Sequence, residues 1–336
     1  MNLIPEPLVS VLTPVYNCEK YLAACIESVL GQTYKNWEYV IVNNCSTDKT
    51  LEIIENYAKK DKRIRIYNTI QLLNVIQNHN YGFSLISPGS KYCKVVQADD
   101  WLFTDCIMKM VEVAEAHPTV GIVGSYRLEE SWVTCDGLPY PSTVVSGMEL
   151  CRSRLLGGPY VFGSPTTLLI RSDLIRSRKL FYNENNLHAD YEVCYEVLKD
   201  FDFGYVHQVL TFTRRHNETE TTFARRLNTY ILGELIILKK YGHVFLSKQE
   251  YDTSLKNRLR GYHEFLGKTI FLPNRKRKEI WDYHKKALKE LGLSISYIKL
   301  FKITCRILLK RFLTIFRIKK QDFPLKDIQP KTQGRF

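Results

Sequence analysis

Residues 9–17 read VSVLTPVYN, and this stretch decides the fold that the sequence predicts. Its apolar run from Val9 to Thr13 is typical of a strand buried on both faces of a parallel sheet. Apolar side chains then recur at helical spacing from Tyr21 to Leu30, and Gly31 gives that predicted helix a C-terminal stop. A buried strand followed directly by a helix predicts the start of a β-α-β unit.

The same alternation continues through the first hundred residues. It predicts strands over 37–42, 63–67 and 92–98, and helices over 51–58 and 80–86. Strand, helix, strand at this spacing predicts a parallel sheet with right-handed crossovers. The later predicted elements are a helix over 105–117, loops and short strands over 121–165, a helix over 191–198, a strand over 204–212 and basic helices from 224 onward.

Polar residues gather where three predicted strands end, over 13–17, over 43–48 and at Asp99 and Asp100. Ligands of parallel α/β sheets bind beyond the carboxyl ends of the strands, so we expect a binding site at this edge. Two adjacent carboxylates there suit a divalent cation, which would neutralise a diphosphate group. Asp-Asp pairs are also common in turns and at helix N-termini, so the pair alone leaves a structural role open.

Seven segments together carry a family pattern. They are 9–17, 21–34, VIVNNCSTD at 40–48, NHNYG at 78–82, QADDWL at 97–102, HADYE at 188–192 and RRH at 214–216. In content and order they resemble the GT-A-fold, family 2 glycosyltransferases, and the resemblance covers residues 8–220. It implies a Rossmann-like α/β domain with a mostly parallel sheet and flanking helices. It also implies inverting transfer of a sugar from a nucleotide-diphosphate sugar to an acceptor hydroxyl.

The resemblance implies a role for each matched position. Thr13, Pro14 and Tyr16 would line the nucleotide pocket, Asn43 or Asn44 would contact the nucleotide base, and Asp99 would lie at the ribose side. Asp100 would bind Mn²⁺ or Mg²⁺, Asp190 would act as the general base, and His216 would bind the metal or the diphosphate. The residues themselves leave simpler alternatives open. Asp190 also suits a helix N-cap, and His216 also suits a solvated basic turn. Trp101 and Trp132 suit core packing as well as stacking on a sugar ring.

Three departures from the family pattern bear on activity. Asn43 and Asn44 stand where acidic residues are usual, so uracil is not the obvious base. Ala189 replaces a glutamate before Asp190, and Ala98 replaces the first aspartate of the longer metal motif. These departures leave a catalytically inactive nucleotide-sugar-binding protein as the alternative function.

The formal charge is unevenly distributed along the chain. Residues 1–220 hold 21 Lys and Arg against 26 Asp and Glu, and residues 221–336 hold 27 against 9. The net charge of +13 therefore divides into −5 and +18. We predict a catalytic domain over 1–220 and a basic, mainly helical extension over 221–336.

Residues 295–320 of this extension combine cations with apolar side chains. The cations Lys299, Lys302, Arg306, Lys310 and Arg317 share one side of a predicted helix, and apolar residues cover most of the rest. Cations recur too often for a spanning helix, so the pattern favours a helix that lies on an anionic membrane. The alternative is a helix that packs on the catalytic domain with a solvated basic stripe. No nucleic-acid partner is expected, because no nucleic-acid-binding motif appears.

The number and spacing of the cysteines indicate the redox compartment of the protein. The nine cysteines are odd in number and contain no CxxC pair, which favours a reducing compartment over a disulfide framework or a zinc site. No signal peptide is visible, so we expect a cytoplasmic protein, with attachment to the inner face of the membrane as the accompanying hypothesis. The expected partners are a nucleotide-sugar donor and a glycan or lipid-linked acceptor in cell-surface polysaccharide or lipopolysaccharide synthesis.

Overall fold

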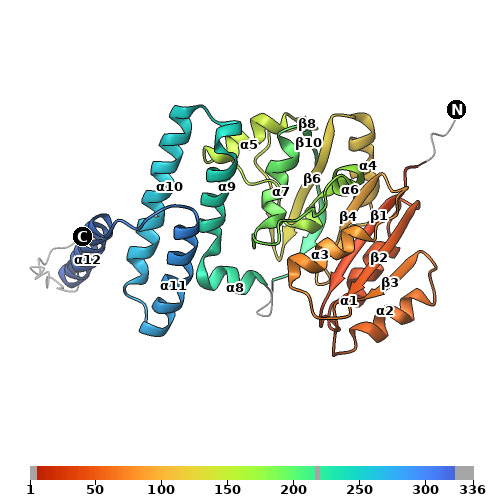
Figure 1. Ribbon diagram of the computed structural model, residues 1–336, viewed down its shortest axis with the longest axis horizontal. Helices are drawn as coiled ribbons and strands as arrows, with labels where there is room; N and C mark the ends of the chain where they lie inside the picture. Colours follow the sequence, from red (N-terminus) through yellow and green to blue (C-terminus); the bar gives the residue numbers. More distant parts are fainter. Residues whose placement is uncertain (1–5, 216–219, 322–336) are drawn as a thin grey trace, which may run out of the picture. The chain divides into compact units, whose positions relative to one another are not determined.

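The computed structural model describes the backbone of residues 6–215 and 220–321, and the side chains of 6–215 and 223–309. The chain divides into two compact units, Met1–Ser254 and Leu255–Phe336. The first unit holds a ten-stranded sheet with flanking helices (Figure 1). Its strands are β1 Val9–Val15, β2 Trp37–Asn43, β3 Ile64–Asn68, β4 Tyr92–Val95, β5 Trp101–Leu102, β6 Val120–Glu129, β7 Trp132–Thr134, β8 Val144–Val145, β9 Leu169–Arg171 and β10 Asp202–Thr213.

Twelve α-helices and one 3₁₀ helix complete the described chain. They are α1 Leu22–Leu30, α2 Thr50–Ala58, α3 Val75–Ser84, α4 Cys106–Ala116, α5 Gly147–Leu155, η1 Pro165–Thr167, α6 Ser172–Arg176, α7 Ala189–Leu198, α8 Glu220–Leu227, α9 Thr229–Phe245, α10 Lys248–Thr269, α11 Asn274–Glu290 and α12 Tyr297–Gln321. No helix in the described part of the chain is long and apolar enough to cross a membrane.

The sheet is mixed, and its strand order is β3-β2-β1-β4-β9-β6-β10-β5. The four strands β1 to β4 are parallel neighbours, as the sequence predicts. The short strand β9 then runs antiparallel to both β4 and β6, and β6 and β10 pair in parallel. The structure therefore confirms an α/β sheet with flanking helices, and it adds an antiparallel strand at the join between two parallel halves.

The core explains why residues 9–17 dominate the sequence pattern. Val9, Val11 and Leu12 are fully buried, and β1 lies between β2 and β4. On α3, Gly82 faces Leu12 so closely that a β-carbon there would lie 2.6 Å from the leucine Cδ1. The glycine thus permits α3 to pack directly on the central strand.

Residues 121–165 differ from the predicted loops and short strands. Residues Val120–Glu129 form a ten-residue strand, β6, and Gly147–Leu155 form the helix α5. Gly124 serves close packing rather than a turn, because a β-carbon there would lie 2.6 Å from the ring of Phe203 on β10. Gly137, Gly157 and Gly163 have positive φ and belong to the loops that the sequence predicted.

The compact units divide at Ser254, whereas the predicted domain boundary lies at residue 220. The reason is that α9 is bound to the sheet domain by polar contacts. Glu234 of α9 pairs with Arg154 of α5, and Lys240 of α9 donates to Glu192 of α7 at 2.5 Å. Residues 221–254 of the predicted extension therefore belong structurally with the sheet unit.

Candidate active site

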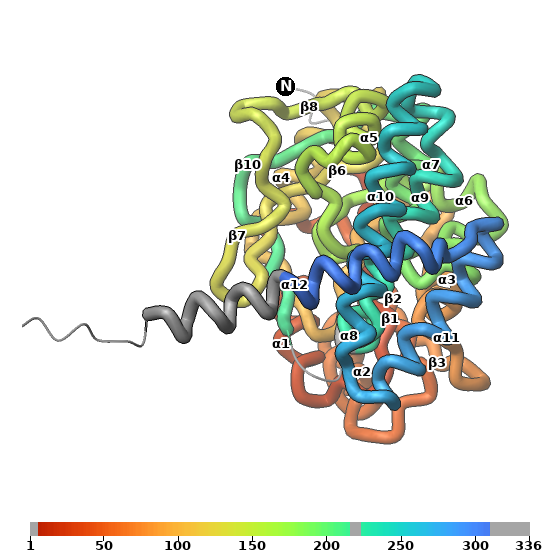
Figure 2. The backbone as a smooth tube through the Cα atoms, turned by 90° about the vertical axis from the view of Figure 1, so that its left-hand side faces the viewer, coloured from red at the N-terminus to blue at the C-terminus, as the bar shows by residue number. Residues whose placement is uncertain are grey.

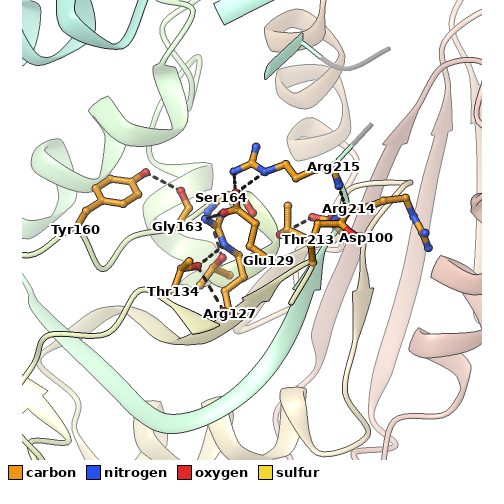
Figure 3. Close-up of polar contacts among 12 residues, drawn as sticks. Asp100, Arg127, Glu129, Thr134, Tyr160, Gly163, Ser164, Thr213, Arg214 and Arg215 are labelled. Carbon is orange, nitrogen blue, oxygen red and sulfur yellow. Dashed lines mark hydrogen bonds and ion pairs between the residues drawn. The ribbon is translucent and has the colours of Figure 1, made fainter. Parts of the chain in front are cut away.

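Asp100 directly precedes β5 and lies beside η1 and the end of β10. Its Oδ2 accepts hydrogen bonds from the hydroxyls of Thr166 at 2.7 Å and Thr213 at 3.3 Å. Its Oδ1 accepts from the backbone N–H of Arg214 at 3.1 Å (Figure 3). The carboxyl group is only 3% exposed, so η1 and the end of β10 fix it in place.

The protonation of Asp100 is sensitive to its surroundings. Burial, and then the charge of Asp99, raise the pKa of Asp100 to about 7, while Thr166, Arg214 and Arg127 lower it. A carboxylate offers about four lone-pair positions, and three hydrogen bonds leave room for about one further contact. Asp99 is less buried and lies beside it. The pair thus offers hard oxygen ligands, which suit Mg²⁺ or Mn²⁺.

Among the described side chains, no group of three or more His, Cys, Asp or Glu residues is placed to hold a metal ion. A cation beside Asp99 and Asp100 would take further ligands from outside these side chains, for example from phosphate oxygens of a bound molecule. His216, the other predicted ligand, lies outside the described residues.

Arg214 brings a positive charge next to the aspartate pair. Its guanidinium carbon lies 4.5 Å from the centre of the Tyr21 ring and 5.2 Å from that of Trp101. Its Nε donates to the backbone carbonyl of Asp99 at 3.3 Å. Trp101 in turn stacks on Phe212 with ring centres 3.6 Å apart, so Trp101 takes the packing role. Aromatic faces and one carbonyl hold the guanidinium, and no ion pair joins it to a carboxylate in the described part of the chain.

The neighbouring Arg215 has the opposite environment. Its backbone N–H donates to Glu130 at 2.6 Å, and its Nε donates to Glu129 at 2.5 Å (Figure 3). Glu129 also accepts from Arg127 at 2.6 Å. The charge of Arg215 is therefore paired within the protein. Sequence reasoning grouped Arg214 and Arg215 as one basic motif and missed the difference, because it depends on Tyr21 and Glu129, which are distant in sequence.

Asp190 lies in the first turn of α7. The N-cap position is His188, and its side chain makes no capping bond, so capping is not the role of Asp190. Burial raises the pKa of Asp190, while the nearby charges of His188 and His79 oppose that rise. A carboxylate with a raised pKa binds a proton more readily than a free aspartate. This is the property required of a general base.

His79 is hydrogen-bonded to the segment that follows β4 and lies within electrostatic range of Asp190. Its Nδ1 lies 2.7 Å from the carbonyl of Val75 and must donate to it, so its Nε2 accepts from the amide of Gln97 at 3.1 Å. Burial lowers the pKa of His79, and the charge of Asp190 opposes that change. Gln97 stands two residues before Asp99. The hydrogen bond to Gln97 and the electrostatic interaction with Asp190 therefore place His79 between the start of α7 and the segment of the aspartate pair.

The segment before α7 is held by buried amides. Asn80 of α3 donates to the carbonyl of Tyr182 and accepts from its N–H, both at 2.8 Å. Glu192 accepts from Asn183 at 3.1 Å and from Asn186 at 2.6 Å. These residues position Asp190 without touching it. The NHNYG segment contains Asn80, but no sequence signal assigned it this contact.

The predicted nucleotide residues of β1 divide into buried and open positions. Thr13 is fully buried and donates its hydroxyl to the carbonyl of Val96 at 2.8 Å. Pro14 is buried in the same strand. Tyr16 follows the strand and is 48% exposed, so it is the one of the three that a ligand can reach directly.

Asn43 and Asn44 are buried, and their amides are used inside the protein. Asn44 donates to the carbonyl of Leu73 and accepts from its N–H, both at 2.9 Å, and it also accepts from Thr69 at 3.1 Å. Asn43 donates to Asn68 at 2.8 Å. The resemblance implies that one of these amides contacts a nucleotide base, whereas in the structure both amides bond to other groups of the protein. Their observed contacts shape the loop between β3 and α3.

Comparisons with known proteins agree with this geometry. A crystal structure of S. aureus TarS 1–349 in complex with UDP-GlcNAc superposes with a TM-score of 0.63 at 17% identity, over 84% of this chain and 80% of that chain. The mannosyltransferase PcManGT of Pyrobaculum calidifontis, in complex with GDP-Man and Mn²⁺, gives 0.53 at 12% identity, over 90% and 80%. At these identities the two structures show a shared fold.

Sequence comparisons extend the likeness. An uncharacterised glycosyltransferase of Haemophilus influenzae is 30% identical over 231 residues, which cover 66% of this chain and 70% of the relative. A putative teichuronic acid biosynthesis glycosyltransferase of Bacillus subtilis, TuaG, is 48% identical over 61 residues, which cover 18% and 24%. Residues 10–176 match the model of glycosyl transferase family 2. The sheet, the aspartate pair that follows β4 and these matches show that the chain is a member of glycosyl transferase family 2.

Proposed function

We propose that this glycosyltransferase is an inverting, metal-dependent enzyme that moves a sugar from a nucleotide-diphosphate sugar to an acceptor hydroxyl. The observation that carries the proposal is the hydrogen bond of His79 to Gln97, which places His79 beside the segment of Asp99 and Asp100, together with the electrostatic interaction between His79 and Asp190. Asp190, a carboxyl group with a raised pKa, therefore lies in the neighbourhood of a pair of oxygen ligands. A base and a diphosphate-binding group are the two parts that single-displacement transfer requires.

The proposed reaction is one displacement at the anomeric carbon. The acceptor oxygen forms a bond to that carbon as its bond to the diphosphate breaks, and Asp190 takes the proton of the acceptor hydroxyl. A positioned base contributes roughly 10²–10⁴-fold to such a step. A divalent cation, Mn²⁺ or Mg²⁺, held at Asp99 and Asp100 would supply charge neutralisation for the leaving diphosphate.

Arg214 completes the proposed donor site. Its guanidinium is already oriented by Tyr21 and Trp101 and is adjacent to Asp99, so it can meet phosphate oxygens without a large loss of side-chain freedom. Tyr16 is the exposed side chain at the end of β1 and is proposed to contact the nucleotide. Donor complexes of TarS and PcManGT, which share the fold, support a nucleotide-sugar ligand.

For the acceptor we propose a glycan or a lipid-linked saccharide used in cell-surface polysaccharide or lipopolysaccharide synthesis. The name of TuaG supports this class, since it refers to teichuronic acid synthesis. The proposed location is the cytoplasm, at the inner face of the membrane, where lipid-linked acceptors are accessible.

One observation favours an alternative, a nucleotide-sugar-binding protein without transferase activity. Asn43 and Asn44 replace the usual acidic residues, and both amides are committed to internal contacts. Such a protein would bind a donor with metal and leave it intact.

The test is binding and hydrolysis of a panel of UDP-, GDP-, CMP- and dTDP-sugars with Mn²⁺. Wild type is compared with Asp100→Ala and Asp190→Asn. We expect turnover of one donor by wild type, loss of metal-dependent binding in Asp100→Ala, and binding without turnover in Asp190→Asn. Binding without turnover by wild type, with acceptors present, would support the alternative. No binding of any donor would contradict both functions.

A further inference from the structure

The N-terminal half of α12 has three distinct sides. One side packs within the second unit: Leu300 is buried, and Gly267 of α10 faces Ile303 and Ile307. A β-carbon at Gly267 would lie 3.0 Å from Ile303 and 3.7 Å from Ile307, so the two helices meet closely at this point (Figure 2). The backbone N–H at Ser296 also donates to His263 of α10 at 3.1 Å. This half of α12 is therefore a fixed part of the unit.

A second side of the same helix exposes large apolar side chains. Ile298 is 72% exposed and Phe301 is 71% exposed, and three further side chains are at least half exposed. Those three are Tyr297, Leu308 and Leu309. At about 100° per residue, the five side chains span an arc of roughly 120°. Large apolar side chains gathered along one side of a helix mark an interaction surface. We call this set the apolar row.

The third side of α12 is cationic. Lys299, Lys302 and Arg306 are exposed and occupy the arc between the apolar row and the packed side. Residues 297–309 contain no acidic residue, and residues 255–336 hold 22 Lys and Arg against 6 Asp and Glu. The apolar row is thus bordered by positive charge in a strongly basic unit.

We propose that the apolar row docks on an anionic lipid bilayer, with Lys299, Lys302 and Arg306 in contact with the headgroups. A bilayer surface accepts apolar side chains and anionic headgroups attract the flanking cations, which matches both sides of the helix. A second copy of this chain fits less well, because it would bring two basic units together. A nucleic acid would match the cations and leave the apolar row uncovered.

This proposal takes up the membrane alternative for residues 295–320 and combines it with packing of α12 within the second unit. Packing and membrane contact occupy different sides of α12, since Leu300, Ile303 and Ile307 belong to the packed side. The sequence pattern alone does not distinguish the apolar residues of the helix that pack inside the unit from those that are exposed. The structure separates the five that remain available for lipid. The side chains of 310–321 lie outside the described residues, so the proposal rests on 297–309.

The experiment measures co-sedimentation of the full chain with vesicles. One set is pure phosphatidylcholine, and the other contains phosphatidylglycerol as well. We compare wild type with the double variant Ile298→Ser/Phe301→Ser and with the charge variant Lys299→Gln/Lys302→Gln/Arg306→Gln. Leu180→Ser, which changes a side chain that is 50% exposed in the first unit, is the matched control. Circular dichroism and donor binding check that each variant is folded.

We expect wild type to bind the anionic vesicles at least tenfold more tightly than the neutral ones. The double variant should lose at least tenfold in anionic-vesicle affinity, the charge variant should lose the preference for anionic lipid, and Leu180→Ser should match wild type. Donor binding should stay unchanged in all of them, which separates this proposal from the proposed transferase activity. Wild type that ignores vesicles, or a double variant that binds them as wild type does, would overturn the proposal. A dimer that the double variant dissociates would reassign the row to a second copy, and salt-sensitive nucleic-acid binding that needs only the cations would also overturn it.

Discussion

The two ends of the sheet use their polar side chains in opposite ways. At the β3-β2-β1 end, Thr13, Asn43 and Asn44 are buried and hydrogen-bonded within the protein. At the β6-β10 end, Arg214 keeps a guanidinium that no described carboxylate pairs with, beside Asp100. One end provides a rigid frame, and the other provides groups that can meet a charged ligand. Substitutions should therefore affect stability at the first end and ligand chemistry at the second.

The largest effect is expected at Asp190, the proposed base. Asp190→Asn keeps the size of the side chain and removes its ability to take a proton, so turnover should fall by roughly 10²–10⁴-fold. Donor affinity should remain near that of wild type. Steady-state turnover with saturating donor and acceptor, alongside calorimetric donor binding, measures both quantities. Equal loss of binding and turnover would assign Asp190 to ligand binding.

A smaller effect separates the two adjacent arginines. Arg214→Ala should weaken nucleoside diphosphate binding by roughly 10–100-fold, since charge-assisted hydrogen bonds are worth about 1.5–3 kcal/mol. Arg215→Ala is the matched control and should change affinity much less, because Glu129 already pairs that side chain. Titrations with UDP, GDP and the corresponding monophosphates measure this contrast. Equal losses in both variants would remove the distinction drawn between the two arginines.

At the other end of the sheet, Asn44→Ala should act mainly on stability. It removes three hydrogen bonds to the loop of Thr69 and Leu73 and leaves buried backbone groups without partners, which should cost about 2–3 kcal/mol. Denaturant unfolding measures this cost. At saturating donor the turnover of the folded variant should be close to that of wild type. A variant of unchanged stability and lost nucleotide binding would instead place Asn44 in direct contact with the base.

The smallest effect is a pH dependence at Asp190. A raised pKa means that the ionised base is lost at a higher pH than for a free aspartate, whose pKa is about 3.9. The acid limb of turnover should therefore lie above that value. The same shift makes the ionised carboxylate unfavourable in the folded state, so wild-type stability falls as pH rises from about 3.9 through the raised pKa. Asp190→Asn should escape this fall and be the more stable form at neutral pH. Unfolding of both forms across that pH range provides the measurement.

The sequence predicted the parallel half of the sheet well because its signals are local. The apolar runs of β1 and β2 and the helical spacing between them lie within 9–43, and each element buries the face that its pattern indicates. The aspartate pair was found from its position after a predicted strand, and Asp190 through a resemblance. In the structure His79 lies between them, hydrogen-bonded to Gln97 and within electrostatic range of Asp190.

The features that sequence reasoning missed depend on residues far apart in the chain. The stacking of Arg214 on Tyr21 joins segments nearly 200 residues apart, and no periodicity reports such a contact. The long strand β6 was obscured by two glycines that serve close packing, Gly121 against Phe201 and Gly124 against Phe203. The boundary at Ser254 likewise depends on ion pairs between α9 and the helices of the sheet domain.

The antiparallel strand β9 has a consequence for how the chain is made. β4 pairs with β1 on one side and with β9 on the other, and β9 is synthesised only after β6 and α5. At about 5–20 residues per second, a growing chain leaves that edge of β4 without its partner for several seconds. Lys94 lies in the middle of this edge, and a charged side chain there discourages pairing with a neighbouring nascent chain. In the finished fold its ammonium group donates to the carbonyls of Thr166 and Leu168, directly before β9. The charge of Lys94 thus opposes pairing at the open edge of β4 during synthesis. In the finished fold its hydrogen bonds hold the segment that leads into β9.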